Sequence, residues 1–183
     1  HAEGLHAEGT FVIPNPWDIG SAKIMEHMGF KALATTSSGF ALTLGRLDGQ
    51  VTFAEKLAHC QQLAAATELP ISADLENMFA DDPETVAENL KRAAATGIVG
   101  GSIEDYDGEK IYDFSHALER VYAAIEARDT LDFPFGLTAR AENLLRNVPD
   151  IEDTIRRLQA FEAAGADVLR SEEHTSELQS RSD

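Results

Sequence analysis

Acidic residues end two short apolar segments of this chain, a pattern that suits the binding of a metal ion. Residues 70–77 read P-I-S-A-D-L-E-N and residues 99–105 read V-G-G-S-I-E-D. On an extended backbone Asp74 and Glu76, two residues apart, should point to the same side. Hard cations such as Mg²⁺ bind carboxylate oxygens. We therefore predict a metal site formed by Asp74, Glu104 and Glu76.

A cation ends a third apolar segment, and small polar residues follow another. Residues 135–140 read F-G-L-T-A-R, and a buried Arg140 would need an anion, either a neighbouring carboxylate or a substrate carboxylate. Ser37, Ser38 and Gly39 offer hydroxyl and backbone N–H groups that suit a carboxylate or a phosphate. We predict that these four residues bind substrate.

Two further residues are candidates for the same site. Asp48 is the only acid in the G-R-L-D-G segment, where it would belong to a loop over the site, although turn formation explains Asp-Gly equally well. Trp17 follows Pro16 and would either line the pocket or pack against the protein. Cys60, in a predicted helix, is interpreted as a small core residue.

The elements that must position these residues alternate along the chain. Six strand-like segments and five helix-like segments recur about every 30 residues, which is typical of a parallel βα fold. A complete (β/α)8 TIM barrel needs about 250 residues, so we predict an α/β barrel truncated to about six strands. A doubly wound sheet is the alternative, but no glycine-rich phosphate motif follows the first strand. The strands are expected at residues 11–13, 32–35, 70–74, 99–105, 135–140 and 166–169, the helices at 18–28, 52–67, 83–97, 114–125 and 151–165, and a loop at 40–50.

Composition argues against several classes of function. The chain has 15 Lys and Arg against 32 Asp and Glu, a formal charge of −17, which disfavours binding to nucleic acid or to anionic membranes. It has one cysteine and no run of 18 apolar residues, and its six histidines lack the H-x-x-x-H spacing of a zinc site. We expect a cytoplasmic protein.

Both ends of the sequence look non-native. Residues 1–9 repeat H-A-E-G, and residues 170–180, R-S-E-E-H-T-S-E-L-Q-S, match the in-frame translation of a common short-read sequencing adapter. We expect a partial barrel domain at residues 1–169 and an adapter-derived, disordered tail at residues 170–183. A partial barrel exposes two sheet edges, so the chain as written is expected to be inactive and to fold poorly.

Six motifs occur in an order that resembles the isocitrate lyase/phosphoenolpyruvate mutase superfamily. The resemblance covers residues 5–169, and the motifs are F-V-I-P-N-P-W-D (11–18), A-T-T-S-S-G-F-A (34–41), G-R-L-D-G (45–49), A-D-L-E (73–76), G-S-I-E-D (101–105) and L-T-A-R (137–140). The resemblance implies a Mg²⁺-dependent enzyme, with Mn²⁺ as an alternative. Such an enzyme would cleave or form a C–C or P–C bond of a small 2-oxo or 2-hydroxy carboxylate through an enolpyruvate-like intermediate. It also implies a homo-oligomer, a dimer or tetramer.

The resemblance assigns roles to individual residues. Ser37, Ser38 and Gly39 would hold the substrate carboxylate, and Arg140 would bind substrate and act in catalysis. Asp74 and Glu104 would organise the metal, with Glu76 in support. Asp48 would be catalytic, as part of a gating loop.

The sequence departs from the superfamily pattern at three places. Ser72 replaces the first acid of a D-A-D motif, and residues 77–79 replace a glycine-rich turn. Residues 106–111, Y-D-G-E-K-I, replace the K-K-C-G-H loop that carries the catalytic cysteine of isocitrate and methylisocitrate lyases. Two alternatives therefore stay open: a barrel that binds a carboxylate metabolite without turnover, and an unrelated aldolase-type barrel. The aldolase would need a Schiff-base lysine, and Lys23, Lys56, Lys91 and Lys110 all fall in predicted helices or loops.

Overall fold

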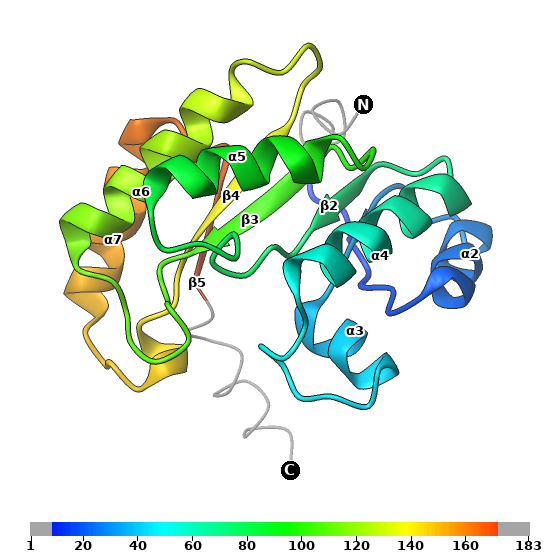
Figure 1. The fold of residues 1–183 in the computed structure, drawn as a ribbon, viewed down its shortest axis with the longest axis horizontal. Helices are drawn as coiled ribbons and strands as arrows, with labels where there is room; N and C mark the ends of the chain where they lie inside the picture. The colour runs from blue at the N-terminus through cyan, green and yellow to red at the C-terminus, as the bar shows by residue number, and fades with distance from the viewer. Residues whose placement is uncertain (1–8, 172–183) are drawn as a thin grey trace.

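A five-stranded parallel sheet lies at the centre of the part of the chain that this computed structural model describes, residues 9–171 (Figure 1). The strands are β1 (Leu33–Ala34), β2 (Ile71–Ala73), β3 (Gly100–Glu104), β4 (Gly136–Ala141) and β5 (Val168–Ser171). The α-helices of these residues are α2 (Ile19–His27), α3 (Ser37–Thr43), α4 (Phe53–Ala66), α5 (Pro83–Ala94), α6 (Phe114–Arg128) and α7 (Ile151–Ala164), and a 3-10 helix, η1 (Leu144–Arg146), follows β4.

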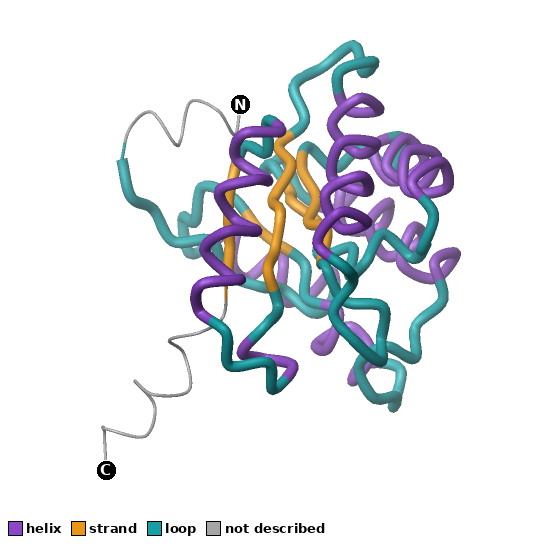
Figure 2. Tube along the Cα trace, turned by 90° about the vertical axis from the view of Figure 1, so that its left-hand side faces the viewer, coloured by secondary structure: helices purple, strands orange, loops and turns teal. Residues whose placement is uncertain are grey.

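The strands pair in the order in which they occur along the chain, and every pairing is parallel. A doubly wound sheet reverses its strand order at a switch point, whereas a barrel adds each strand beside the previous one. The helices follow the same rule, because α4 contacts α5, α5 contacts α6 and α6 contacts α7. Figure 2 shows the helices (purple) packed around the strands (orange). The predicted partial barrel is therefore confirmed, with five strands in the described residues instead of about six.

Aspartates begin three of the predicted helices, as their sequence positions indicate. Asp18 accepts a hydrogen bond from the Ser21 N–H at 2.7 Å, Asp82 accepts one from the Thr85 N–H at 2.8 Å, and Asp150 caps α7 in the same way. Each carboxylate satisfies an N–H group that has no partner within the first turn of its helix. The helix starts near residues 18, 82 and 150 are thus confirmed.

The predicted first strand, residues 11–13, is wrong. These residues form no strand, and just beyond them the Ala34 N–H donates a hydrogen bond of 3.1 Å to the Pro14 carbonyl. Pro14 and Pro16 have no N–H group and so cannot extend a ladder. The side chain of Val12 is accordingly 69% exposed.

The predicted loop at residues 40–50 begins inside a helix. α3 starts at Ser37, where the Thr36 hydroxyl accepts a hydrogen bond from the Gly39 N–H at 3.3 Å. The helix buries Phe40 and Ala41 in a small core of its own. A helix of seven residues is too short to show a clear period in the sequence.

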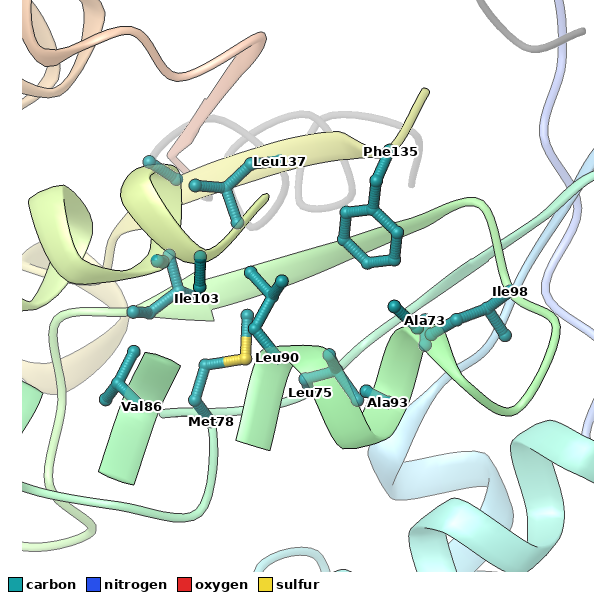
Figure 3. Packing of buried hydrophobic residues seen from close by; sticks show 14 of the residues in the cluster. Ala73, Leu75, Met78, Val86, Leu90, Ala93, Ile98, Ile103, Phe135 and Leu137 are labelled. Atoms are coloured by element: carbon teal, nitrogen blue, oxygen red, sulfur yellow. The ribbon is translucent and has the colours of Figure 1, made fainter. Parts of the chain in front are cut away.

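The main core lies between the sheet and the surrounding helices, and Figure 3 shows part of it beside α5. Leu75 and Met78, from the segment after β2, pack with Leu90 of α5 and Ile103 of β3. Gly101 permits this packing, because a Cβ atom there would lie 2.8 Å from Leu75 Cδ1. The core thereby fixes the chain on either side of the acidic residues that follow β2.

Residues 1–8 and 172–183, which include most of the expected adapter-derived tail, lie outside the described residues. Arg170 and Ser171, its first two residues, are part of β5. Across residues 9–171, no helix combines the length and the apolar character that a membrane span requires.

Candidate active site

Three of the predicted site residues meet where adjacent strands end. Glu104 of β3 and Arg140 of β4 are register partners, and Asp74 follows the last residue of β2. Arg140 Nη1 lies 2.9 Å from Glu104 Oε1 and 3.3 Å from Asp74 Oδ1. One guanidinium therefore bridges two carboxylates at the carboxyl ends of the strands, where α/β barrels place their active sites.

A third carboxylate, that of Glu142, also binds Arg140. Glu142 Oε1 lies 2.8 Å from Arg140 Nη2 and accepts a hydrogen bond from Arg140 Nε at 2.9 Å. Glu142 is 1% exposed, and its backbone N–H donates to Asp105, which in turn binds Arg157. The sequence reasoning missed Glu142, although its position two residues after Arg140, just past the end of β4, was a usable signal.

The buried acids of this cluster have opposite pKa shifts. Burial opposes ionisation of Asp74, but Arg140, Lys56 and the Ser37 N–H outweigh it and hold the pKa of Asp74 below its usual value. Burial raises the pKa of Glu104, and the negative charges of Glu142 and Asp74 add to this effect against the opposing Arg140. At Glu104 burial thus outweighs the arginine, whereas at Asp74 the cations and the N–H group outweigh burial.

Two adjoining pockets open at this end of the sheet. The larger, about 670 Å³, is lined by Asp74 and Arg140, and the smaller, about 330 Å³, by Glu76 and Tyr106. Both are lined by Ser37, Asp48, Glu104 and Arg146. A cavity of this size suits a small metabolite.

Ser37 and Ser38, which are predicted to bind a carboxylate, line the larger pocket. Gly39, the third residue of that prediction, lines neither pocket, and nor does Trp17, for which packing was the alternative to lining the pocket. The Ser37 N–H donates to Asp74 Oδ2 at 3.1 Å. The indole of Trp17 covers Gly39, where an added Cβ atom would lie 2.5 Å from Trp17 Cδ1. Trp17 and Gly39 therefore shape the start of α3 rather than the pocket wall.

Asp48 lies on an exposed loop that borders both pockets. Gly45 and Gly49, with φ angles of +68° and +76°, flank it in the left-handed region that glycine adopts readily. Arg46 Nη1 lies 2.9 Å from both carboxylate oxygens of Glu55, which ties the loop to α4.

Glu76 does not join Asp74 and Glu104, contrary to the prediction from the strand pattern. β2 ends at Ala73, and Glu76 has a φ angle of +51°, so the backbone is not extended between the two acids. Its carboxylate lines the smaller pocket, where Oε1 is buried without a hydrogen-bond partner, and burial raises its pKa to about 7.

The segment after Asp74 adopts left-handed conformations at two more residues that are not glycine, Met78 (φ +60°) and Phe79 (φ +54°). The buried Arg120 of α6 holds this segment, because its guanidinium donates to the carbonyls of Asn77 and Ala80. The same guanidinium donates to the Glu104 carbonyl at 3.0 Å. Arg120 thus joins the two acidic strand ends through their backbones.

The residues at the strand ends provide some, but not all, of the ligands that a hard divalent cation such as Mg²⁺ requires. Within residues 9–171 no group of three or more His, Cys, Asp and Glu side chains is placed to hold a metal ion. Asp74 and Glu104, however, supply two carboxylates, and Mg²⁺ is commonly bound through one or two carboxylates together with waters and substrate oxygens. The negative charges of Glu142 and Asp74, which add to the effect of burial on the pKa of Glu104, would also attract a cation.

Two cations near the site were not predicted. Arg146 of η1 borders both pockets, and no sequence pattern marks a residue in a 3-10 turn after a strand. Lys56 of α4 is fully buried, its Nζ atom has no hydrogen-bond partner, and its charge lowers the pKa of Asp74. The position of Lys56 inside a predicted helix did not indicate that its side chain would be buried near Asp74.

The sheet, the helix layer and the strand-end charges define the class of parallel (β/α) barrel proteins. Within that class, the chain belongs to the phosphoenolpyruvate phosphomutase family, whose model matches residues 2–179. This confirms the family that the six sequence motifs indicated.

Three comparisons illustrate the relationship. An uncharacterized Mycobacterium tuberculosis protein is 34% identical over 166 residues, which are 89% of this chain and 61% of the relative. The crystal structure of a Burkholderia cenocepacia J2315 protein that is provisionally named a lyase/mutase is 49% identical to this chain, with a TM-score of 0.91. The match covers 96% of this chain and 65% of that one. The crystal structure of 2,3-dimethylmalate lyase, named as a PEP mutase/isocitrate lyase superfamily member, is 28% identical with a TM-score of 0.80, at 88% and 58% coverage. This chain therefore spans about three fifths of the length of its relatives.

Proposed function

We propose that the protein to which this chain belongs is a Mg²⁺-dependent lyase or mutase that acts on a small 2-oxo or 2-hydroxy carboxylate. It would cleave or rearrange a C–C or P–C bond through an enolpyruvate-like intermediate, with Mn²⁺ as an alternative metal. The observation that carries the proposal is the contact of Arg140 with Asp74 and Glu104 at the edge of a 670 Å³ pocket. Family membership supports it.

Asp74 and Glu104 would hold the metal ion. When bound, Mg²⁺ polarises substrate oxygens and stabilises the negative charge of an enolate, which contributes several kcal/mol to catalysis. Asp74 is suited to this role because Arg140, Lys56 and the Ser37 N–H keep its carboxylate ionised despite its burial. Arg140 keeps the two acids together through its contacts with both.

The substrate would lie in the larger pocket beside Arg140 and the serines of α3. Ser37 and Ser38 would bind its carboxylate, and Arg140 would offset the charge of that group. Gly39 would act indirectly, by leaving room for Trp17 at the start of the same helix. Asp48 would close over the bound substrate on its glycine-flanked loop and exclude water from the reacting bond. Trp17 would support this arrangement from outside the pocket, through its contact with Gly39.

The test is a turnover assay on the full-length natural protein with oxaloacetate, phosphonopyruvate and methylisocitrate. We expect activity with at least one substrate, its loss on addition of EDTA, and its recovery with Mg²⁺. Glu104→Gln should lower the rate on the order of a hundredfold, and the exposed Glu109→Gln serves as the matched control. Turnover that is unaffected by chelation would overturn the metal role.

A second candidate is a barrel that binds a carboxylate metabolite without turnover. Two observations favour it. Ser72 stands where many members carry an acid, and residues 106–111 form a short loop closed by a bridge between Tyr106 and Ile111 instead of a cysteine-bearing loop. In that case the same ligands would bind with measurable heat, and no product would form from any of them.

The dimer or tetramer that the resemblance implies is part of the same proposal. Light scattering on the full-length protein measures it, and a monomeric mass at micromolar concentration would argue against it.

A further inference from the structure

Arg146 differs from the other arginine of the site in its contacts. The guanidinium of Arg140 is bound to Asp74, Glu104 and Glu142 at 2.8–3.3 Å. Arg146 Nη2 lies 3.6 Å from Glu104 Oε2 and 3.6 Å from Glu142 Oε2, which is outside hydrogen-bonding distance. Among the described residues, none accepts a hydrogen bond from the Arg146 side chain, and its Nε atom is buried without a partner.

The guanidinium of Arg146 is nevertheless held in one place. Its Cζ atom lies 3.9 Å from the centre of the Tyr106 ring, a distance typical of a stacked cation–π contact. A guanidinium stacked on a ring keeps its N–H edges available, and these edges match the two oxygens of a carboxylate. The side chain is 30% exposed and borders both pockets. It is therefore preorganised to receive an anion.

The charges around the two pockets indicate where such an anion would lie. The smaller pocket is lined by four acids, Asp48, Glu76, Glu104 and Asp107, with Arg146 as the cation that opposes them. The larger pocket is lined by three acids, Asp48, Asp74 and Glu104, and by three arginines, Arg140, Arg146 and Arg170, so its charges are balanced. An anion in contact with Arg146 is thus favoured on the side of the larger pocket, near the proposed substrate site.

We infer that Arg146 binds a second carboxylate of the substrate and so selects dicarboxylic acids over monocarboxylic acids. The inference rests on the proposed function for the location of the first carboxylate, beside Arg140 and the α3 serines. It goes further in naming a specificity residue and the chemical class of the ligand. A monocarboxylate would leave Arg146 without a hydrogen-bond acceptor, whereas a dicarboxylate would supply one.

The test compares malate with 2-hydroxybutyrate, which carries a methyl group in place of the second carboxylate. Dissociation constants would be measured by calorimetry on the full-length natural protein with Mg²⁺. The unmodified protein should bind malate about tenfold or more tightly than 2-hydroxybutyrate. Arg146→Gln should reduce this preference to about twofold or less, and Arg146→Lys should retain part of it.

Arg92→Gln is the matched control, because Arg92 also stacks on an aromatic ring, that of Phe53, but lies outside both pockets. It should leave the preference for malate unchanged, and circular dichroism should show that all three variants are folded. An unmodified protein that binds malate no more tightly than 2-hydroxybutyrate would overturn the inference. So would an Arg146→Gln variant that keeps the preference for malate, or one in which the binding of both ligands is weakened equally. Because no turnover is measured, an Arg146-dependent preference would support this binding site even if the proposed catalysis failed.

Discussion

Arg120 offers the strongest test of how the acidic strand ends are held. Its replacement by Met keeps most of the volume and removes the guanidinium, which donates to the carbonyls of Glu104 (3.0 Å), Ala80 (2.9 Å) and Asn77. A hydrogen bond from a charged donor contributes about 1.5–3 kcal/mol, and a buried carbonyl left without a donor costs about 1–3 kcal/mol. The Cζ atom also lies 4.2 Å from the centre of the Tyr112 ring, a contact that would be weakened.

These effects are not additive, so we expect Arg120→Met to lower the free energy of unfolding by about 3–5 kcal/mol, as for other broken buried charge contacts. This is a large part of the usual total of about 5–15 kcal/mol. The left-handed conformations at Glu76, Met78 and Phe79 should also relax, because each costs about 1–2 kcal/mol and Arg120 binds the carbonyls on either side of Met78 and Phe79.

Urea unfolding of the full-length natural protein measures the loss, with Arg92→Met as the control for removal of an exposed arginine. Hydrogen exchange of residues 76–81 measures the relaxation, and it should increase in the Arg120 variant alone. A loss below about 1 kcal/mol, within the range of ordinary surface substitutions, would refute the reasoning.

Three further predictions concern buried or crowded residues. Burial, reinforced by a nearby lysine, lowers the pKa of His59 to about 4, so between about pH 6.5 and 4 the unfolded chain binds a proton that the folded chain does not. Stability should therefore fall as the pH drops through this window, and His59→Gln should flatten that part of the urea-denaturation profile; an unchanged slope would contradict this. Burial raises the pKa of the Cys60 thiol to about 11, so a thiol reagent should react slowly with the native protein and rapidly in urea, and immediate reaction in native buffer would count against it. Gly39→Ala should displace Trp17, the chain's only tryptophan, and shift its fluorescence spectrum, whereas Gly136→Ala, where an added Cβ meets nothing within 4 Å, should not. An identical spectrum for Gly39→Ala would disprove the contact.

The sequence predicted those parts of the fold that depend on local chemistry. Aspartate caps, proline after Asp82 and apolar residues three and four positions apart identified the helices α2, α4, α5, α6 and α7. It failed at residues 11–13, where apolar composition suggested a strand and two prolines prevent one. Composition does not encode which N–H groups are available to a neighbouring strand.

The site was predictable where a charge ends a regular strand, as at Glu104 and Arg140. It was not predictable where the backbone leaves the extended form. A strand would place the side chains of Asp74 and Glu76 on the same side, but the left-handed conformation of Glu76 directs its side chain elsewhere. Arg146 lies in a 3-10 turn, and its stacking on Tyr106 joins two segments about 40 residues apart in sequence. Such a contact follows from the closed fold and from no local pattern.

The sequential order of the sheet has a consequence for how the protein is made. Each strand pairs with the strand before it, and each helix from α4 onward packs against the next. Contacts between neighbouring βα units can therefore form before distant parts of the chain have been synthesised. The growing polypeptide can add one unit at a time to the unit already folded, starting with the pairing of Leu33 with Ile71 and of Ala34 with Ser72. Folding during synthesis would then proceed from the amino terminus, and the strand ends that carry Asp74, Glu104 and Arg140 would come together in the order in which they are translated.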